Sequence, residues 1–223
     1  MKKGLKRFII LFSAVILIAA LGFVLWASAA APASLRALDE GRTTSVALVE
    51  SVNGWQVFRP TQGQPSAGLI FYPGGRVSFQ AYAPLLRPLA EQGYLVVVPP
   101  MPLNLAIFGV NTASEVIAAY PQVKHWAIGG HSLGGSMAAS YARANPGKVE
   151  GLLLWASYPA GADDLSKSDL KVVSVYASND GLATPAKVEA SRPLLPASTR
   201  WVLIEGGNHA GFGSYGAQSG DGT

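Results

Sequence analysis

The hydrophobic positions divide the chain into one long apolar run near the start and a series of short runs after it. Residues 8–31 contain no charged side chain, whereas later runs such as LVVV, GLLLW and VVSVY are only a few residues long. These short runs are continuous rather than alternating, which is typical of strands that are covered on both faces. Helix-length segments separate them, so the pattern predicts an α/β fold with a mostly parallel sheet and helices on both faces.

The expected elements can be placed along the chain from residue 46 onward. Val46–Val52 and Trp55–Arg59 flank Asn53-Gly54, a strong hairpin signal, so two antiparallel strands should open the domain. The other expected strands are Leu69–Tyr72, Tyr94–Val98, His125–Gly129, Glu150–Ser157, Val172–Ser178 and Arg200–Glu205, and the expected helices are Tyr82–Gln92, Thr112–Tyr120, Leu133–Ala144 and Pro185–Leu195. Only about a dozen residues separate the strands at Glu150–Ser157 and Val172–Ser178, so we expect no inserted cap domain.

The N-terminal segment has the pattern of a membrane anchor. A basic cluster precedes the uncharged residues 8–31, which are longer than the apolar part of a secretory signal and long enough to cross a bilayer as a helix. Trp26 lies near the far end, where interfacial aromatic residues are common. The basic residues are Lys2, Lys3, Lys6 and Arg7. They should stay in the cytoplasm, which places the remainder of the chain outside it.

A cleaved signal peptide is the alternative, because Ala27-Ser28-Ala29 fits the small-x-small pattern of signal peptidase sites. Both interpretations export the rest of the chain. The expected organisation is an anchor or signal at 1–31, a linker or short juxtamembrane helix at 32–45, and one folded domain at 46–223.

Charge and composition exclude several classes of protein. The net charge is +4, but four of the 17 basic residues lie in the N-terminal cluster, and the remaining 13 equal the 13 acidic residues. The folded domain therefore has no excess of basic residues for nucleic acid, and nucleic-acid binding is not expected. The absence of cysteine excludes a disulfide scaffold and a cysteine-ligated metal.

A serine surrounded by glycines is the sharpest sign of chemistry. Gly130-His131-Ser132-Leu133-Gly134 lies between the strand expected to end at Gly129 and the helix expected to begin at Leu133. A serine at such a turn projects its hydroxyl above the sheet, and side chains in place of the glycines would collide with neighbouring backbone. We predict that Ser132 is a nucleophile rather than part of an ordinary tight turn.

A serine nucleophile needs a base to take its proton. Of the three histidines, His209 follows the last expected strand in a glycine-rich loop, at the carboxyl edge where ligands bind in such sheets. His131 should pack inside the turn, and His125 should lie at the surface where a strand begins. His209 is therefore the predicted base.

The imidazole in turn needs an acceptor that fixes its tautomer. Asp180 follows the penultimate strand, and the order Ser132, Asp180, His209 is the one expected on this type of sheet. An aspartate before glycine is also a common turn former. Asp163 and Asp164, which follow the preceding strand, are the alternative acceptors.

Attack on a carbonyl creates an oxyanion that backbone N–H groups must stabilise. The Leu133 amide, at the start of its helix, is one expected donor. The other is the Gly75 amide in Pro73-Gly74-Gly75-Arg76, although this segment viewed alone could be an ordinary turn. Arg76 could meet an acidic substrate or simply be a solvated loop residue.

The segments IFYPGG, IGGHSLGGSMAA, ASNDGLATP and IEGGNHAGFG, in this order, resemble the α/β-hydrolase superfamily and, within it, the compact bacterial group of dienelactone hydrolase and small esterases. The similarity covers roughly residues 46–215. It implies a mostly parallel sheet of eight strands, a triad of Ser132, His209 and Asp180, and no metal or organic cofactor.

Two features depart from the family pattern. Pro73-Gly74 stands where many relatives carry His-Gly before the oxyanion loop. Only 14 residues follow His209, five of them glycine, so the helix that normally closes the fold has little sequence to form from. The chain could be a fragment or could end unusually early, so the sequence does not establish that the His209 loop is rigid.

The expected activity is hydrolysis of small-molecule carboxylic esters through an acyl-enzyme. Thioester cleavage or cofactor-free perhydrolysis on the same triad is the nearest alternative, and a non-catalytic surface binding protein is the alternative from another class. Without a cap the pocket should be open. The apolar loop Pro102–Gly109 lies on the same side, where it could line an acyl site, touch the membrane or pack beneath a helix.

Overall fold

A computed structural model describes residues 3–223, and it places eight strands in one sheet. The order across the sheet is β1-β2-β4-β3-β5-β6-β7-β8. The strands are β1 (Ala47–Val52), β2 (Trp55–Pro60), β3 (Ala67–Tyr72), β4 (Leu95–Val98), β5 (His125–His131), β6 (Gly151–Trp155), β7 (Lys171–Ala177) and β8 (Arg200–Ile204). β2 pairs antiparallel with β1 and β4, and every other neighbouring pair is parallel. The predicted mostly parallel sheet with a leading hairpin is confirmed.

The hairpin turn has the backbone that its sequence demands. Asn53 and Gly54 adopt φ values of 54° and 79°, the left-handed conformation of a two-residue turn whose twist matches that of the strands it joins. Asparagine and glycine tolerate this region better than other residues.

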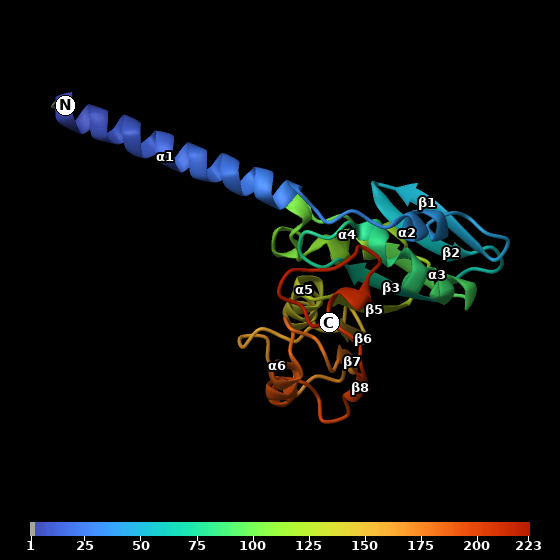
Figure 1. Cartoon of the computed structure of the whole chain (residues 1–223). Helices are drawn as coiled ribbons and strands as arrows, with labels where there is room; N and C mark the ends of the chain where they lie inside the picture. The colour runs from blue at the N-terminus through green and yellow to red at the C-terminus, as the bar shows by residue number, and fades with distance from the viewer. Residues whose placement is uncertain (1–2) are drawn as a thin grey trace.

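Helices cover both faces of the sheet (Figure 1). They are α2 (Leu35–Glu40), α3 (Ala83–Glu91), α4 (Thr112–Ala119), α5 (Leu133–Ala144) and α6 (Pro185–Ala190), with short 3₁₀ turns η1 (Phe79–Tyr82), η2 (Pro102–Asn104), η3 (Ala106–Phe108), η4 (Arg192–Leu194) and η5 (Ala210–Phe212). Alternate residues of β3 enter opposite clusters: Leu69 and Phe71 pack with α3, whereas Ile70 and Tyr72 pack with α4 and α5. This two-sided burial explains the continuous apolar runs.

One predicted helix is shorter than expected. The segment Pro185–Leu195 forms α6 only to Ala190 and continues as the 3₁₀ turn η4. Pro193 has no N–H to donate and restricts the residue before it, so an α-helix cannot pass through this point without strain. The segment 32–45, predicted as a linker or a short juxtamembrane helix, contains α2. The Ser34 hydroxyl caps this helix by accepting the Ala37 N–H at 3.1 Å.

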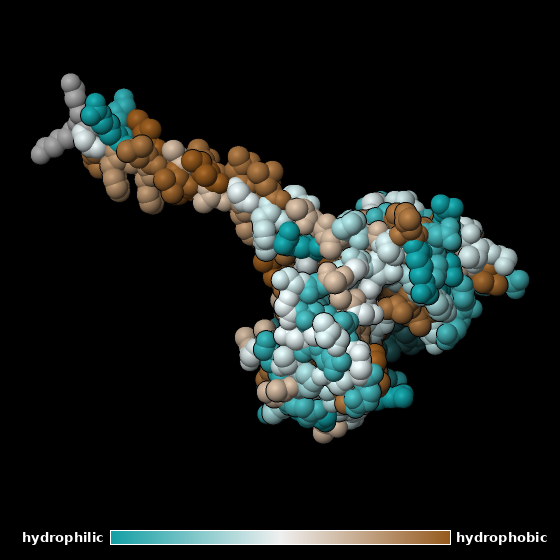
Figure 2. All heavy atoms as spheres, in the orientation of Figure 1, coloured by the Kyte–Doolittle hydropathy of each residue, from teal (hydrophilic) through white to brown (hydrophobic). Residues whose placement is uncertain are grey.

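The N-terminal helix α1 (Lys3–Ser28) projects from the domain as a rod whose surface is almost entirely hydrophobic (Figures 1 and 2). Over Gly4–Ser28 it is long and apolar enough to cross a membrane, a property that anchors and signal sequences share. Between β6 and β7, residues 156–170 form a loop, and no cap domain is inserted there.

Candidate active site

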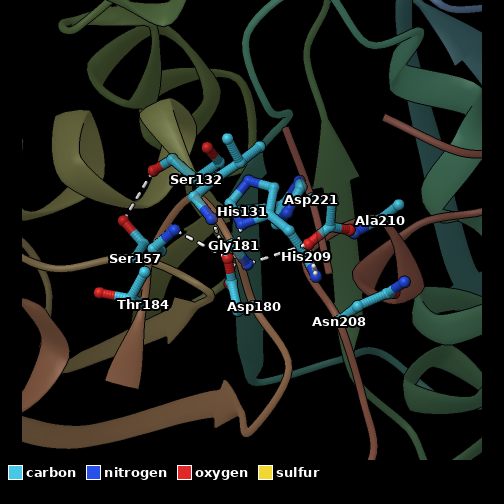
Figure 3. A network of polar contacts seen from close by, with 12 residues as sticks. His131, Ser132, Ser157, Asp180, Gly181, Thr184, Asn208, His209, Ala210 and Asp221 are labelled. Atoms are coloured by element: carbon cyan, nitrogen blue, oxygen red, sulfur yellow. Dashed lines mark hydrogen bonds and ion pairs between the residues drawn. The ribbon is translucent and has the colours of Figure 1, made fainter. Parts of the chain in front are cut away.

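Ser132 occupies the sharp turn between β5 and α5, at the carboxyl edge of the sheet. Its φ of 52° and ψ of −123° are rare for a residue with a side chain. Residues at and just after the end of β6 hydrogen-bond to its backbone on both sides. The Ser132 N–H donates to the Trp155 carbonyl at 2.9 Å, and the Ser157 hydroxyl donates to the Ser132 carbonyl at 2.6 Å (Figure 3). Strain that surrounding contacts impose in this way is common at functional sites.

The glycines around Ser132 are required by close backbone packing. A Cβ atom on Gly130 would lie 2.6 Å from the Tyr72 carbonyl oxygen, and one on Gly134 would overlap the carbonyl oxygens of Tyr72 and Pro73. Rigid backbone atoms cannot move aside as a flexible side chain can. The turn that carries Ser132 can therefore form only with glycine at these positions.

His209 and Asp180 form a buried pair beside this turn. The Asp180 Oδ2 atom lies 2.8 Å from His209 Nδ1, and both side chains are almost completely buried (Figure 3). The other carboxylate oxygen, Oδ1, accepts the N–H groups of Leu182 and Ala183 at 2.8 and 2.7 Å. One Asp180 oxygen therefore stabilises the turn at residues 180–183, and the other contacts the imidazole. The sequence suggested these two roles, turn former and imidazole acceptor, as alternatives.

The alternative acceptors lie elsewhere. Asp163 accepts a hydrogen bond from Ser140 on α5, and Asp164 accepts the Ser166 N–H at 2.9 Å. Neither carboxylate is the partner of His209. The contact with Asp180 leaves Nε2 as the imidazole nitrogen available for chemistry.

Ser132 and His209 are not hydrogen-bonded in this conformation. Within residues 3–223, His209 Nε2 is buried and has no hydrogen-bond partner. Such contacts are often long in a substrate-free site and tighten when substrate binds. The structure therefore joins His209 to Asp180 and sets Ser132 at the same edge of the sheet, while the contact between hydroxyl and imidazole stays open.

His131 connects the turn to the loop that follows β3. Its Nδ1 atom lies 2.9 Å from the Tyr82 hydroxyl, which in turn accepts the Gly74 N–H at 2.8 Å. Burial, together with the nearby His209, lowers the pKa of His131 to about 3, so the ring is neutral at pH 7. Burial also raises the pKa of Tyr82, which keeps its proton available to His131. His131 packs inside the turn as expected, and His125 is exposed at the start of β5, 2.8 Å from Glu150.

Gly75 and Leu133, whose amides are the two expected oxyanion donors, are neighbours in space. A Cβ atom on Gly75 would stand 3.2 Å from Leu133 Cδ2. The amides of Gly74, Arg76 and Val77 donate to Tyr82, Asn104 and Gly74, respectively. Among the described residues, the Gly75 and Leu133 amides have no such acceptor. These two N–H groups are therefore free to receive a developing negative charge.

Asp221, which the sequence did not identify as a site residue, holds the His209 loop. Its carboxylate accepts four backbone N–H groups, those of Gly181, His209, Ala210 and Gly222, at 3.2, 3.0, 2.8 and 2.8 Å (Figure 3). Burial raises the pKa of Asp221, but the four N–H groups outweigh it and hold the pKa below its usual value.

The tail that carries Asp221 contacts the loops of His209 and Asp180. After η5 the described residues contain no further α-helix, and the tail turns back over the loops that carry His209 and Asp180. The Ser214 N–H also donates to the Ala81 carbonyl at 2.8 Å. The tail is therefore joined to the His209 loop by hydrogen bonds, although it forms no closing helix among the described residues. No periodic pattern could have shown this, since an Asp-Gly pair in a glycine-rich segment has the composition of an ordinary turn.

Within residues 3–223, no group of three or more His, Cys, Asp or Glu side chains is arranged to hold a metal ion. The polar groups at the edge of the sheet are instead a hydroxyl, an imidazole, a carboxylate and free amides. Such a set can perform nucleophilic attack with general acid–base assistance.

Comparisons with known proteins agree with this architecture. A family model described as the alpha/beta hydrolase family matches residues 68–223. No curated protein matches the sequence.

Many solved structures share the fold at low sequence identity. An α/β hydrolase enzyme from the metagenome of Mar Chica lagoon sediments has a TM-score of 0.60 at 18% identity, covering 73% of this chain and 89% of its own. A proposed dienelactone hydrolase from Klebsiella pneumoniae has a TM-score of 0.59 at 19% identity (74% and 87%). The esterase domain of a Rhodothermus marinus protein has a TM-score of 0.58 at 15% identity (73% and 88%).

Proposed function

The chain belongs to the α/β hydrolase family, and we propose that it cleaves carboxylic esters through Ser132, His209 and Asp180. The observation that carries the proposal is the buried pair of His209 and Asp180, with a 2.8 Å contact at Nδ1, beside a serine on a strained strand-to-helix turn. Asp180 fixes the tautomer in which Nε2 can accept a proton.

The reaction proceeds through an acyl-enzyme. The Ser132 hydroxyl oxygen bonds to the ester carbonyl carbon while its proton passes to His209 Nε2, and the Gly75 and Leu133 amides stabilise the oxyanion. The carbon–oxygen bond to the leaving group then breaks, and His209 returns the proton to the departing alcohol. Water attacks the acyl-enzyme in the same way, releasing the acid and restoring Ser132. Each amide donor contributes about 3 kcal/mol to lowering the barrier.

A neutral His131 favours this cycle. The centroid of its ring lies 4.6 Å from that of His209, where a second positive charge would oppose the protonation of the base. Because His131 has its pKa lowered to about 3, it carries no charge when His209 takes the serine proton near neutral pH.

We also propose that α1 remains attached as a membrane anchor with the domain outside the cytoplasm. Ala27 is fully buried against the domain, and the Ala29 carbonyl accepts a hydrogen bond from Arg76 at 2.9 Å. The residues that resemble a signal peptidase site are therefore engaged by the folded domain. Sequencing the N-terminus of the exported protein tests this: an anchor keeps the first residues, whereas a mature chain that begins near residue 30 contradicts it.

A fluorophosphonate probe tests the hydrolase itself. We expect the full chain to be labelled and to hydrolyse p-nitrophenyl acetate, Ser132→Ala to lose both properties, and the control Ser166→Ala to keep both. Adding a thioester of the same acyl group to the assay separates ester from thioester hydrolysis. A folded protein that neither reacts with the probe nor cleaves any ester or thioester would overturn the proposal.

A further inference from the structure

The end of α1 packs onto the loops that surround Gly75. The Asn104 side-chain amide donates to the Ala27 carbonyl at 3.1 Å, and Ala31 forms a parallel bridge with Val77. The Arg76 guanidinium lies 4.4 Å above the Trp26 ring, a cation–π contact. In Figure 1 the segment that carries η2 and η3 meets the helix at this junction. The proposed oxyanion loop and the anchor thus form one continuous structure.

This packing sets the depth of the domain relative to a bilayer. Residues 8–27 of α1 would span about 30 Å of hydrocarbon at 1.5 Å per residue. Phe23 lies inside this span, and its ring packs edge-on against Phe108 with centroids 6.3 Å apart. Phe108 and Ile107 of η3 are 51% and 47% exposed. A helix that crosses the membrane therefore carries η3 into its outer interface.

A cleft connects this interface with the proposed oxyanion loop. It has a volume of about 530 Å³, and its lining includes Trp26, the alanines that follow α1, Gly75 and Leu105. Ala217 of the C-terminal tail forms part of another wall. Trp26, Val77, Leu105 and several alanines make part of the lining apolar, while Arg76, Gln218 and Ser219 add polar groups. The Gly75 N–H has no hydrogen-bond acceptor among the described residues.

We propose that the substrates are long-chain acyl esters held in the membrane, which enter from the outer leaflet with the acyl chain in this cleft. The mixed lining fits such a molecule: the hydrocarbon chain would lie against Trp26 and Leu105, and the ester carbonyl would reach the Gly75 amide. The apolar loop Pro102–Gly109 then has a defined use, because Ile107 and Phe108 would contact the membrane while Leu105 lines the cleft. The inference rests on the proposed ester hydrolase activity.

The test uses the full chain in phosphatidylcholine nanodiscs with two fluorogenic esters, 4-methylumbelliferyl oleate in the bilayer and 4-methylumbelliferyl acetate in solution. Ala217→Trp places a large side chain in the cleft, and Ala186→Trp, on the exposed face of α6, is the matched control. We expect Ala217→Trp to lower oleate turnover by about tenfold, the factor that corresponds to losing the burial of roughly two methylene groups. Acetate turnover and fluorophosphonate labelling should stay within about twofold of wild type, the effect expected of an exposed surface substitution.

A second variant tests the membrane contact without touching the cleft walls. The double substitution Ile107→Ser and Phe108→Ser removes the exposed apolar side chains, and it should lower oleate turnover while sparing acetate. Equal loss of both activities, or no loss of oleate turnover in either variant, would overturn the inference. If wild type cleaves acetate but not oleate, the substrate class is wrong and the hydrolase proposal stands. If it cleaves neither ester and resists the probe, the hydrolase proposal itself fails.

Discussion

Replacing Asp221 tests whether the C-terminal tail positions the imidazole. Asp221→Ala removes the acceptor of four backbone N–H groups, two of which belong to His209 and Ala210. A hydrogen bond of this kind contributes about 1 kcal/mol, so up to about 4 kcal/mol that favours the closed loop is lost. Water can reach the half-buried site and replace part of this, which leaves about 2 kcal/mol.

Asp221→Asn should have a smaller effect. One amide oxygen can still accept the three N–H groups that meet Oδ1, but the side-chain NH₂ then faces the Ala210 N–H across a contact that was 2.8 Å. One bond and the negative charge are lost, a cost of about 1–2 kcal/mol. Activity should therefore be highest in wild type, lower in Asp221→Asn and lowest in Asp221→Ala.

The assay is the rate of fluorophosphonate labelling together with kcat and KM for a soluble ester. If the closed loop is only marginally favoured, losing about 2 kcal/mol of its stability lowers the population of the closed, active conformation roughly thirtyfold. We expect this loss in kcat and in the labelling rate with little change in KM, and faster hydrogen exchange at the His209 and Ala210 amides. Asp164→Asn, which removes a carboxylate that accepts one N–H far from the site, is the control.

If Asp221→Ala is labelled by the fluorophosphonate probe at the wild-type rate, the proposed role of the tail is refuted. An equal decrease in Asp164→Asn would refute the reasoning differently, since it would mean that any loss of surface carboxylate disturbs the enzyme. Rescue by Asp221→Glu is not expected, because the longer side chain cannot place both oxygens on the same four N–H groups.

Three further predictions follow from the site. Asp180→Asn should reduce kcat by about four orders of magnitude in kinetic assays, because the imidazole loses the partner that fixes its tautomer, while the fold is retained by circular dichroism. Gly134→Ala forces a Cβ atom against two carbonyl oxygens and should cost about 3 kcal/mol or more in urea denaturation, whereas Gly161→Ala, where nothing lies within 4 Å, should stay within about 0.5 kcal/mol. His131 has a pKa of about 3 in the folded protein and an ordinary value of 6.5, so the unfolded chain binds the extra proton below pH 6.5. The free energy of unfolding should therefore decrease as the pH is lowered below 6.5, and His131 accounts for a loss of about 2.7 kcal/mol at pH 4.5. His131→Asn should make the free energy of unfolding less dependent on pH, as measured by denaturation at several pH values.

The fold could be predicted because its elements leave local patterns. Continuous apolar runs identified the buried strands, and Asn53-Gly54 fixed the hairpin through its own backbone preference. The predicted helix at 185–195 was too long, because Pro193 ends its α-helical part. These features depend on neighbouring residues, which a sequence shows directly.

The candidate site was predictable only in part, for a related reason. Residues that follow strands of a parallel sheet collect at one edge, so Ser132, Asp180 and His209 could be proposed together. Choosing among three aspartates required distances, because Asp163 and Asp164 follow a neighbouring strand and satisfy the same rule. Asp221 left no pattern at all, since its partners are backbone groups.

The loop that carries Gly75 shows why such long-range contacts matter for the proposed chemistry. Arg76 adopts a φ of 57°, a conformation that costs on the order of 1 kcal/mol for a residue with a side chain. From the core, the Tyr82 hydroxyl accepts the Gly74 N–H; from the other side, the Ala31 N–H donates to the Arg76 carbonyl at 2.7 Å. Because hydrogen bonds fix both of its neighbours, Gly74 and Arg76, the Gly75 amide is held in position although it has no acceptor of its own. A proposed oxyanion donor is thus positioned by the protein core and by the segment that follows α1, through contacts that no periodic pattern in the sequence reveals.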